Sequence, residues 1–413
     1  MGDILFLAHR VPFPPDRGDK MRSFHLLRHL AGLARVHLCA FADDAADIAD
    51  AEALRPLLAG LHVERRGHSI ARAGLAALAS GRPVSLALFD GAAMRGAVAR
   101  LLASEPIDTI FAFSGQMAQF VPAGDGRRFV MDFVDVDSAK FAAYAEDAGA
   151  LSRWVHQREA RLLLAHERAT AARADASLFV SEAEAALFRD RTGAERVMVA
   201  ENGIDLEYYD PLADFVRLSA ADHGAGPLIV FTGQMDYRPN IEAVESFALE
   251  SFPAITRRFP SARFVIVGRD PASAVQRLGQ RHHVTVTGAV ADVRSWLAAA
   301  DVVVAPLRLA RGVQNKVLEA MAMVRPVVAS PAAFEGIDVT PGVHLLVAGR
   351  DEEGDAVASL LGDRGKARSL AVAARARVEA RYGWAGRLAP LASIVGRGGA
   401  GEDAPDEPAS GAA

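Results

Sequence analysis

Short apolar runs alternate with longer stretches of helical pattern along almost the whole chain, and this alternation is the feature that most constrains the fold. Such a chain builds βαβ units, in which parallel strands form a sheet that helices cover. We therefore expect an α/β protein. In the first half the expected strands are Ile4 to Ala8, Val36 to Phe41, Thr109 to Phe113, Phe129 to Phe133, Ser177 to Val180 and Val197 to Ala200.

The pattern starts afresh in the second half, which indicates a second domain. With 413 residues the chain also exceeds the usual size of one hydrophobic core. The stretch from Gly203 to Gly226 has no steady periodicity and is interpreted as the connection. The strands expected after it are Leu228 to Thr232, Arg263 to Val267, Val284 to Thr287, Asp301 to Ala305 and Pro326 to Ala329.

These patterns predict a domain organisation with four parts. Residues 1–205 and 206–383 form two parallel-sheet α/β domains, and residues 384–395 form a terminal helix that could pack back on the first domain. Residues 396–413 consist largely of Gly, Ala, Pro, Ser and acidic residues, and are expected to be a disordered tail.

Composition narrows the class of protein. The formal net charge of −5 gives no basic excess, so nucleic acid is not expected as a partner. The single cysteine, Cys39, excludes an internal disulfide framework and fits a reducing compartment. The apolar run at the N-terminus is too short for a signal peptide, and no apolar run reaches the roughly 18 residues of a membrane span. We expect a cytoplasmic protein, with peripheral association with the inner membrane left open.

The segment from Arg311 to Ser330 bears most directly on function. A polar loop containing Gly312 leads into a helix that begins near Asn315, and an apolar strand follows. The unpaired amides at a helix N-terminus suit a phosphate or diphosphate. Lys316 and Glu319 share one helical face, where the cation suits phosphate oxygens and the carboxylate suits sugar hydroxyls. The alternative is an ordinary amphipathic helix with a surface ion pair.

Two further loops of the second half follow strands. Gly233 comes directly after the first of these strands. Asn240 is interpreted as the N-cap of the next helix, and Arg238 as a cation free to reach a ligand. Another strand ends at Gly288, where main-chain groups of the turn through Val290 are expected to bracket a flat base.

The loop after the first strand of the chain is a second candidate site for an anion. Its prolines stiffen it, and Gly18 permits a close approach of the backbone. Arg17, Lys20 and Arg22 supply positive charge next to a helix N-terminus. The alternative is a rigid connector with solvated charges.

Polar residues near two other strand ends complete the candidates. Asp135 and Asp137 are separated by one residue and could hold a divalent cation. The preferred interpretation makes Asp135 a residue facing a cleft and Asp137 the N-cap of the next helix, with a metal as the minority alternative. The 12 histidines show no zinc-binding spacing, and His9, at the end of the first strand, is the one candidate among them. No metal is expected.

Several of these segments resemble the GT-B glycosyltransferases of family 4. They are ENGID at Glu201 to Asp205, FTGQMDYRPN, the strand and turn VTVTG, WLAAADVVVAPL and NKVLEAMAMVRPVVAS. The stretches PFPPDRGDKMRSFHLL and DFVDVDSAKF look like a narrower group, the sugar transferases associated with the PEP-CTERM and exosortase exopolysaccharide system. The similarity runs from about Ile4 to the terminal helix.

The resemblance implies two Rossmann-like domains whose parallel sheets face each other across a cleft. It places a nucleotide-sugar site in the second half, where Glu319 holds the ribose hydroxyls and Lys316 pairs with the diphosphate. It places the acceptor site in the first half, with Arg17, Gly18, Lys20 and Asp135 on the acceptor side. No cofactor is implied, because the nucleotide sugar, UDP- or GDP-linked, is a substrate.

The chain departs from the family pattern at two positions. Many members carry a glutamate that contacts the donor sugar eight residues before the one matching Glu319, and here that position is Arg311. Gln234 stands where an arginine is common, and Arg238 is the candidate substitute. Donor-sugar recognition is therefore the least defined part of the resemblance.

The leading hypothesis is a retaining glycosyltransferase that moves a sugar from a nucleotide-diphosphate donor to a glycan or lipid-linked acceptor in exopolysaccharide biosynthesis. Lys316, Arg238 and Arg311 are candidates to stabilise the leaving diphosphate. Asp135 or His9 would orient the acceptor hydroxyl. A sugar-nucleotide epimerase or hydrolase of GT-B shape is the rival enzyme class, and a non-catalytic nucleotide-sugar-binding protein is the third hypothesis.

Overall fold

The structure, a computed structural model, describes residues 2–15, 17–67, 70–124, 126–146, 148–310 and 313–398. The chain divides into two compact units, one made of residues 1–202 with the chain from residue 388 onward, the other of residues 203–387. Residues 203–205 lie in the second unit, because the backbone N–H of Ile204 donates to the carbonyl of Tyr382 at 2.7 Å and Ile204 also bridges to Gly383.

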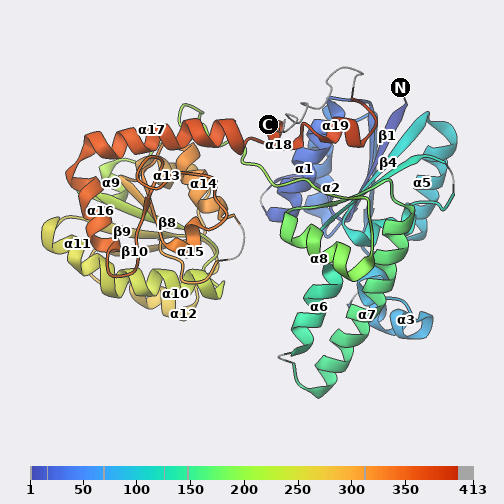
Figure 1. Ribbon diagram of the computed structural model, residues 1–413, viewed down its shortest axis with the longest axis horizontal. Coiled ribbons are helices and arrows are strands. Elements are labelled where there is room, and N and C mark those ends of the chain that lie inside the picture. The colour runs from blue at the N-terminus through green and yellow to red at the C-terminus, as the bar shows by residue number, and fades with distance from the viewer. Residues whose placement is uncertain are drawn as a thin grey trace, which may run out of the picture. The chain divides into compact units, whose positions relative to one another are not determined.

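The first unit is a seven-stranded parallel sheet with helices on its faces (Figure 1). Its strand order is β3-β2-β1-β4-β5-β6-β7. The buried runs of Val, Ile, Leu and Phe are those expected of parallel strands covered on both faces. The strands are β1 (Asp3–Ala8), β2 (Val36–Ala42), β3 (Gly60–Arg65), β4 (Ile107–Phe113), β5 (Arg128–Val134), β6 (Ala176–Phe179) and β7 (Val197–Val199).

Helices connect successive strands of this sheet in the βαβ manner. A long helical hairpin, α6 with α7, follows β5 and extends away from the sheet (Figure 1). The helices are α1 (Gly18–Ala31), α2 (Ala45–Ala51), α3 (Ile70–Ser80), α4 (Val84–Leu88), α5 (Ala92–Ser104), α6 (Asp137–Glu146), α7 (Ala150–Arg173), α8 (Glu182–Thr192) and α19 (Leu391–Ile394), with 3-10 helices η1 (Glu52–Leu57) and η2 (Gly115–Phe120).

The second unit repeats the architecture with a six-stranded parallel sheet in the order β10-β9-β8-β11-β12-β13. Its strands are β8 (Leu228–Thr232), β9 (Arg263–Val267), β10 (Val284–Gly288), β11 (Val302–Ala305), β12 (Val327–Ala329) and β13 (Leu346–Val347). Its helices are α9 (Ala220–His223), α10 (Arg238–Ser246), α11 (Phe252–Arg258), α12 (Ser273–Leu278), α13 (Val293–Ala299), α14 (Asn315–Ala322), α15 (Pro331–Phe334), α16 (Glu353–Gly362) and α17 (Arg364–Arg381), with the π-helical turn η3 (Phe247–Ser251) between α10 and α11. The short helix α18 (Trp384–Leu388) ends where the first unit resumes.

The eleven expected strands are all present, and the sequence reading missed two more, β3 and β13. β3 is a half-exposed edge strand of mixed polar and apolar residues, so it carries neither a continuous apolar run nor a clean alternation. β13 is only two residues long, which is too short for any periodicity.

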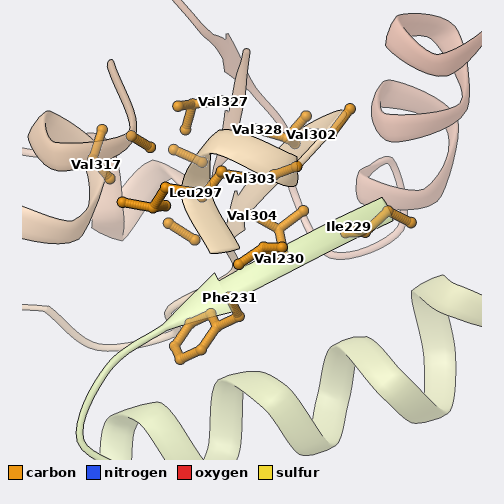
Figure 2. Close-up of a cluster of buried hydrophobic side chains, with 14 of the residues drawn as sticks. Ile229, Val230, Phe231, Leu297, Val302, Val303, Val304, Val317, Val327 and Val328 are labelled. Atoms are coloured by element: carbon orange, nitrogen blue, oxygen red, sulfur yellow. The ribbon is translucent and has the colours of Figure 1, made fainter. Parts of the chain in front are cut away.

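The core of the second unit fixes the start of α14. Valine and isoleucine side chains from β8, β11 and β12 meet Leu297 of α13 and Val317 of α14 (Figure 2). Val317, Leu318 and Met321 are buried on one side of the helix, while Lys316 and Glu319 keep part of their surface exposed. Val317, which follows Asn315 and Lys316 in the chain, is thus anchored in the core. This anchor holds the N-terminal turn of α14 in place.

The end of the described chain is tied to the first unit. The Nη1 of Arg128 donates to the carbonyl of Ile394 at 3.1 Å, and the Nη2 of Arg397 donates to the carbonyl of Gly2 at 2.9 Å. Arg397 also pairs with Asp108. The expected tail therefore does not begin at residue 396, and residues 399–413 lie outside the described part of the chain.

Candidate functional site

The second sheet has a topological switch point between β8 and β11. The chain passes outward from β8 to β9 and β10, then crosses to the other side of β8 to form β11. Open α/β sheets bind ligands at such points, beyond the carboxyl ends of the strands. The loop after β8 contains Gly233 and Gln234, and the loop after β11 leads to Asn315 at the start of α14. The predicted donor segments therefore flank the same switch point.

Lys316 is held at this point by two neighbours. Its Nζ donates a hydrogen bond to Oδ1 of Asn240 at 2.5 Å and lies 4.3 Å from the centroid of the Phe231 ring. The Nδ2 of Asn240 donates in turn to the carbonyl of Gln234 at 2.9 Å. Burial lowers the pKa of Lys316 to about 8, so the amine is still mostly protonated at neutral pH.

Asn240 has a different role from the one predicted. Helix α10 begins at Arg238, with Tyr237 at its N-cap position, so Asn240 lies in the first turn rather than before it. Its amide links the loop after β8 to Lys316 of α14. The N-cap interpretation was therefore wrong, and Asn240 orients the lysine instead.

Glycines end three neighbouring strands at this edge. A Cβ on Gly233 would lie 2.8 Å from the Nδ2 of Asn240 and 3.1 Å from the Nζ of Lys316, so a side chain here would force the Asn240 amide to shift and would crowd the amine. A Cβ on Gly268 would lie 1.6 Å from the carbonyl oxygen of Gly233. Gly288 has a φ of +69°, which favours glycine. Gly268 was not predicted, although it follows β9 as Gly233 follows β8, and Gly288 is the last residue of β10.

Glu319 is fixed by a residue that the sequence analysis did not single out. The hydroxyl of Tyr209 donates a hydrogen bond to its carboxylate, and burial raises the pKa of Glu319 while the nearby Lys316 opposes that rise. The Tyr209 ring is buried and packs edge-on against Tyr208, with ring centroids 4.9 Å apart. Tyr209 belongs to a stretch without periodicity, which is why no pattern pointed to it.

The other predicted donor residues are more loosely placed. Asn315 is exposed at the first position of α14, and Val290 is half-buried against the core. The side chain of Arg238 is 88% exposed and its Nε pairs with Oε1 of Glu242 at 2.7 Å, whereas Lys316 is contacted by Asn240 and Phe231. Arg311 and Gly312 lie outside the described residues.

The first sheet has its own switch point, between β1 and β4. His9 directly follows β1, and its ring stacks on Phe113 at the end of β4 with centroids 5.6 Å apart. Its Nε2 lies 3.3 Å from Oδ2 of Asp19. Burial lowers the pKa of His9 despite this carboxylate, so the neutral imidazole is favoured near pH 7. A neutral ring beside a carboxylate is able to accept a proton.

The cations of the first loop are bound by carboxylates, which corrects the expectation of an anion site there. Lys20 is buried and its Nζ contacts Oδ1 of Asp47 at 2.7 Å. The Nε of Arg17 lies 3.0 Å from Oδ1 of Asp19. Gly18 is exposed as the first residue of α1, and a Cβ there would meet no described atom within 4 Å. The space beside Gly18 is open, and a close approach of a ligand to its backbone stays a prediction.

Arg22 belongs to the interior rather than to a ligand site. It is 1% exposed, and its Nη2 lies 2.8 Å from Oδ2 of the fully buried Asp132. Its Nη1 donates to the carbonyl of Ala200 at 2.7 Å and to Oδ1 of Asn202 at 2.9 Å. Arg22 thus ties α1 to β5 and to the last residues before the second unit.

Asp135 and Asp137 share a lysine. The Nζ of Lys140 lies 2.7 Å from Oδ2 of Asp135 and 3.5 Å from Oδ1 of Asp137, so an ammonium group stands where a shared metal would. Asp137 is the first residue of α6 rather than the residue before it. Val134, just before Asp135, has a φ of +72°, and Ser114 after β4 has a φ of +75°. Such strain in residues other than glycine is typical of functional sites.

A group of potential metal ligands in the described chain lies elsewhere, at the start of the first sheet. It consists of Asp3, His37 and Glu105. The Nε2 of His37 lies 2.8 Å from Oδ2 of Asp3, which also lies 3.6 Å from Nη1 of Arg35. The Asp3 carboxylate already has a neighbouring cation and a hydrogen-bonding ring, so this group is explained by internal pairing.

Comparison with known proteins gives a partial match in sequence. Residues 226–363 match the family described as "Glycosyl transferases group 1". A GDP-mannose-dependent alpha-(1-6)-phosphatidylinositol monomannoside mannosyltransferase of Mycobacterium tuberculosis is 32% identical over 212 residues. That alignment covers 47% of this chain and 54% of the relative, so the chain spans about half the length of the curated relative it matches.

Solved structures match over nearly the full length. Sucrose-phosphate synthase from Thermosynechococcus elongatus aligns with a TM-score of 0.64 at 20% identity, covering 95% of this chain and 98% of that one. Anabaena HepE in complex with UDP aligns with a TM-score of 0.61 at 18% identity, covering 95% and 99%. These matches and the two parallel-sheet units confirm the predicted GT-B fold. No described helix has the length and apolar character needed to cross a membrane.

Proposed function

We propose that this protein is a glycosyltransferase that moves a sugar from a nucleotide-diphosphate donor to an acceptor hydroxyl. The observation that carries the proposal is the placement of Lys316. Its amine lies at the switch point of the second sheet, in the first turn of α14, against Gly233 and Asn240. This combination of a helix N-terminus, a lysine and a glycine-lined strand end suits a diphosphate.

The donor chemistry follows from charge. As the bond between sugar and diphosphate breaks, negative charge grows on the leaving phosphate, and a positioned cation with helix amides stabilises it. Lys316 supplies the cation, and we include Arg238 and Arg311 as further candidates. Glu319, held by Tyr209, is proposed to bind the ribose hydroxyls. Gly288 and Val290 are proposed to bracket the base.

The acceptor is proposed to bind at the first sheet. His9 and Asp135 follow β1 and β5 at its carboxyl edge, where the backbone is strained at Ser114 and Val134. Either polar group would orient the attacking hydroxyl. We further propose that the sugar keeps its anomeric configuration, because the described site offers phosphate-binding groups and a leaving-phosphate oxygen is itself able to take the acceptor's proton.

The named relatives support the donor class without fixing the base. The Mycobacterium relative is named as GDP-mannose-dependent, and HepE was solved with UDP and with UDP-glucose. We therefore propose a UDP- or GDP-linked donor. A glycan or lipid-linked acceptor, in exopolysaccharide biosynthesis at the inner face of the membrane, is proposed from the family resemblance alone.

Nucleotide binding provides the direct test. Isothermal calorimetry with GDP and UDP is expected to show binding of at least one of them by the parent protein. Lys316→Ala is expected to weaken it roughly ten- to hundredfold, because hydrogen bonds to charged groups contribute about 1.5–3 kcal/mol. Lys366→Ala, at an exposed lysine of α17, is the matched control and should bind as the parent does. Equal affinities for parent and Lys316→Ala would overturn the assignment of Lys316.

Turnover separates the enzyme classes. A radiolabelled UDP- or GDP-sugar should give labelled product only with an acceptor extract. Acceptor-independent release of a free sugar or of an epimer would select a hydrolase or epimerase, and tight binding without turnover in any extract would select a binding protein.

A further inference from the structure

Helix α3 has an inverted distribution of apolar side chains. Its inner side consists of Ala73 and Ala77, which pack with Ala87 of α4. Its outer side carries Leu75 and Leu78, which are 71% and 55% exposed. A helix of a globular protein normally buries its leucines, so a helix that buries alanines and exposes leucines has an outer side suited to a further apolar contact.

The start of α7 carries a second exposed apolar stripe. Leu151, Trp154 and Val155 are 78%, 55% and 42% exposed and recur at helical spacing. The same stripe reaches Arg158 one turn later, and the Nη2 of Arg158 donates to the carbonyl of Ala77 at 2.8 Å. This bond joins α7 to the C-terminal part of α3, the helix that lies beside it in Figure 1. We name Leu75, Leu78, Leu151, Trp154 and Val155 the α3–α7 surface.

This part of the first unit is firmly built. Both carboxylate oxygens of the buried Glu159 accept hydrogen bonds from the N-terminal backbone of α4, at 2.8 Å from Val84 and 2.9 Å from Ser85. Arg158 closes the other side through Ala77 and Arg82. The exposed apolar side chains thus project from a braced support and not from a fraying end.

The two segments that carry the surface contain charges of one sign. Residues 70–80 and 150–158 contain Arg72, Arg153 and Arg158 and no aspartate or glutamate, although the whole chain has 51 acidic residues and a net charge of −5. Glu146, at the end of α6, is the described acidic residue that precedes them in the chain. Leucines and a tryptophan among arginines are the composition of helices that lie at an anionic lipid surface.

We propose that the α3–α7 surface docks the protein on an anionic lipid bilayer. Leu151, Trp154 and the α3 leucines enter the boundary between headgroups and acyl chains, and Arg153 meets the lipid phosphates. The hairpin α6–α7 starts two residues after Asp135, at the carboxyl edge of the first sheet. Resting on the proposed function, this docking presents a lipid-linked acceptor at the edge that holds His9 and Asp135.

Vesicle flotation of the full chain tests the proposal. The parent is expected to float with vesicles of phosphatidylcholine and phosphatidylglycerol, and more weakly with phosphatidylcholine alone. The double variant Leu151→Ser with Trp154→Ser should bind at least about tenfold more weakly, because it removes two large apolar side chains from the contact. Arg153→Glu should lose about fivefold or more with the anionic vesicles only. Parent and double variant that float equally would overturn the proposal.

Matched controls test whether vesicle binding depends on the α3–α7 surface or on any exposed apolar side chain. Leu212→Ser with Val216→Ser replaces two residues of the second unit that are 89% and 74% exposed, and this variant should float as the parent does. Trp154→Phe should still bind but lose the blue shift of tryptophan emission that vesicles cause in the parent, since Trp384 is buried and Trp296 half-buried.

Two further readouts distinguish the possible failures. Sedimentation velocity without lipid should give the same species for the parent and the double variant. A parent dimer that the double variant converts to a monomer would show that a second copy covers the surface, against the proposal. Calorimetry of the double variant with GDP and UDP should match the parent. Vesicle binding without nucleotide binding would refute the proposed function alone, and nucleotide binding without vesicle binding would refute the docking alone.

Discussion

At the scale of single residues, the second unit prepares Lys316 for an anion. Its amine has exchanged water for Phe231 and the Asn240 amide, and neither neighbour carries a negative charge. A phosphate would therefore meet a cation that no carboxylate contacts directly within the described site. Arg17, Lys20 and Arg22 of the first unit are all paired with aspartates, which is why we assign the diphosphate to the second unit.

The lowered pKa of Lys316 predicts how donor affinity depends on pH. Between the phosphate pKa near 6 and the Lys316 pKa of about 8, the amine is mostly protonated and affinity should be constant. As pH rises through that value the free protein loses the cation, and affinity for GDP or UDP should fall by about tenfold per pH unit. The terminal phosphate of the nucleotide has already ionised near pH 6 and does not cause this fall.

Calorimetric titrations at a series of pH values measure this dependence. Lys316→Arg is the control, because arginine stays charged over the whole range and its affinity should not decline near pH 8. A parent curve as flat as that of Lys316→Arg would contradict a role for the lysine charge.

Tyr209→Phe is expected to weaken donor binding about two- to tenfold, because it removes one hydrogen bond from the partly buried Glu319. If the carboxylate binds ribose, the deoxyribose forms of GDP and UDP should lose less affinity in this variant than the ribose forms do. Calorimetry with each pair of nucleotides gives the comparison.

The adjacent Tyr208→Phe serves as the control, because the Tyr208 hydroxyl contacts Asp292 instead, at 3.3 Å. Should both tyrosine variants lose affinity equally, the effect would reflect general packing of the two rings and not the orientation of Glu319.

At the scale of elements, one buried ion pair joins α1 to β5. Arg22 and Asp132 are inaccessible to water, and the guanidinium also holds the chain at Ala200 and Asn202. Burial of both charges is costly, and the pair tolerates it because each charge has several partners. The pair fixes where β5 ends, and Asp135 follows three residues later.

Asp132→Asn is therefore expected to lower the free energy of unfolding of the first unit by about 3–5 kcal/mol, because it leaves Arg22 buried without its counter-charge. Denaturant unfolding measured by far-UV circular dichroism gives the value. The comparison variant is Asp135→Asn, which breaks a half-exposed pair with Lys140 and should cost at most about 1 kcal/mol. Similar costs for the two variants would show that the Arg22 pair is not decisive.

At the scale of the whole molecule, the chain forms two units of the same architecture. Each unit has a parallel sheet with one switch point, and candidate residues gather beside the first strand of each sheet. The chain returns to the first unit at its end, where Leu391, Ile394 and Val395 are buried. The first unit therefore depends on residues that follow the second unit in the sequence.

This return predicts separable effects on the two units. Leu391→Ala should lower the stability of the first unit by about 2–5 kcal/mol, since the leucine is 1% exposed. Leu370→Ala, at a leucine of α17 that is 3% exposed, should affect the second unit instead. Scanning calorimetry of both variants, with and without GDP or UDP to mark the nucleotide-binding unit, assigns each transition. If both variants lowered the midpoint temperature of the same unfolding transition, the division of the chain into two units would be contradicted.

The sequence by itself determined the fold class and the identity of the loops that matter. Buried parallel strands read as continuous apolar runs, so eleven of the thirteen strands in the described residues could be predicted. Lys316 and Gly233 stand at strand and helix ends that local patterns mark. The half-exposed strand β3 and the two-residue strand β13 carry too little pattern to detect.

Only the tertiary structure decided which polar groups are free to bind and which are already used. Asn240, Tyr209 and Gly268 act through partners 76, 110 and 35 residues away in sequence, and no local period records such distances. The same holds for Lys20 and Arg22, whose charges looked available until Asp47 and Asp132 were seen beside them. The periodicity of apolar residues indicates the face of a helix or strand on which a side chain lies. The residue that the side chain contacts on another element is decided by how the elements pack.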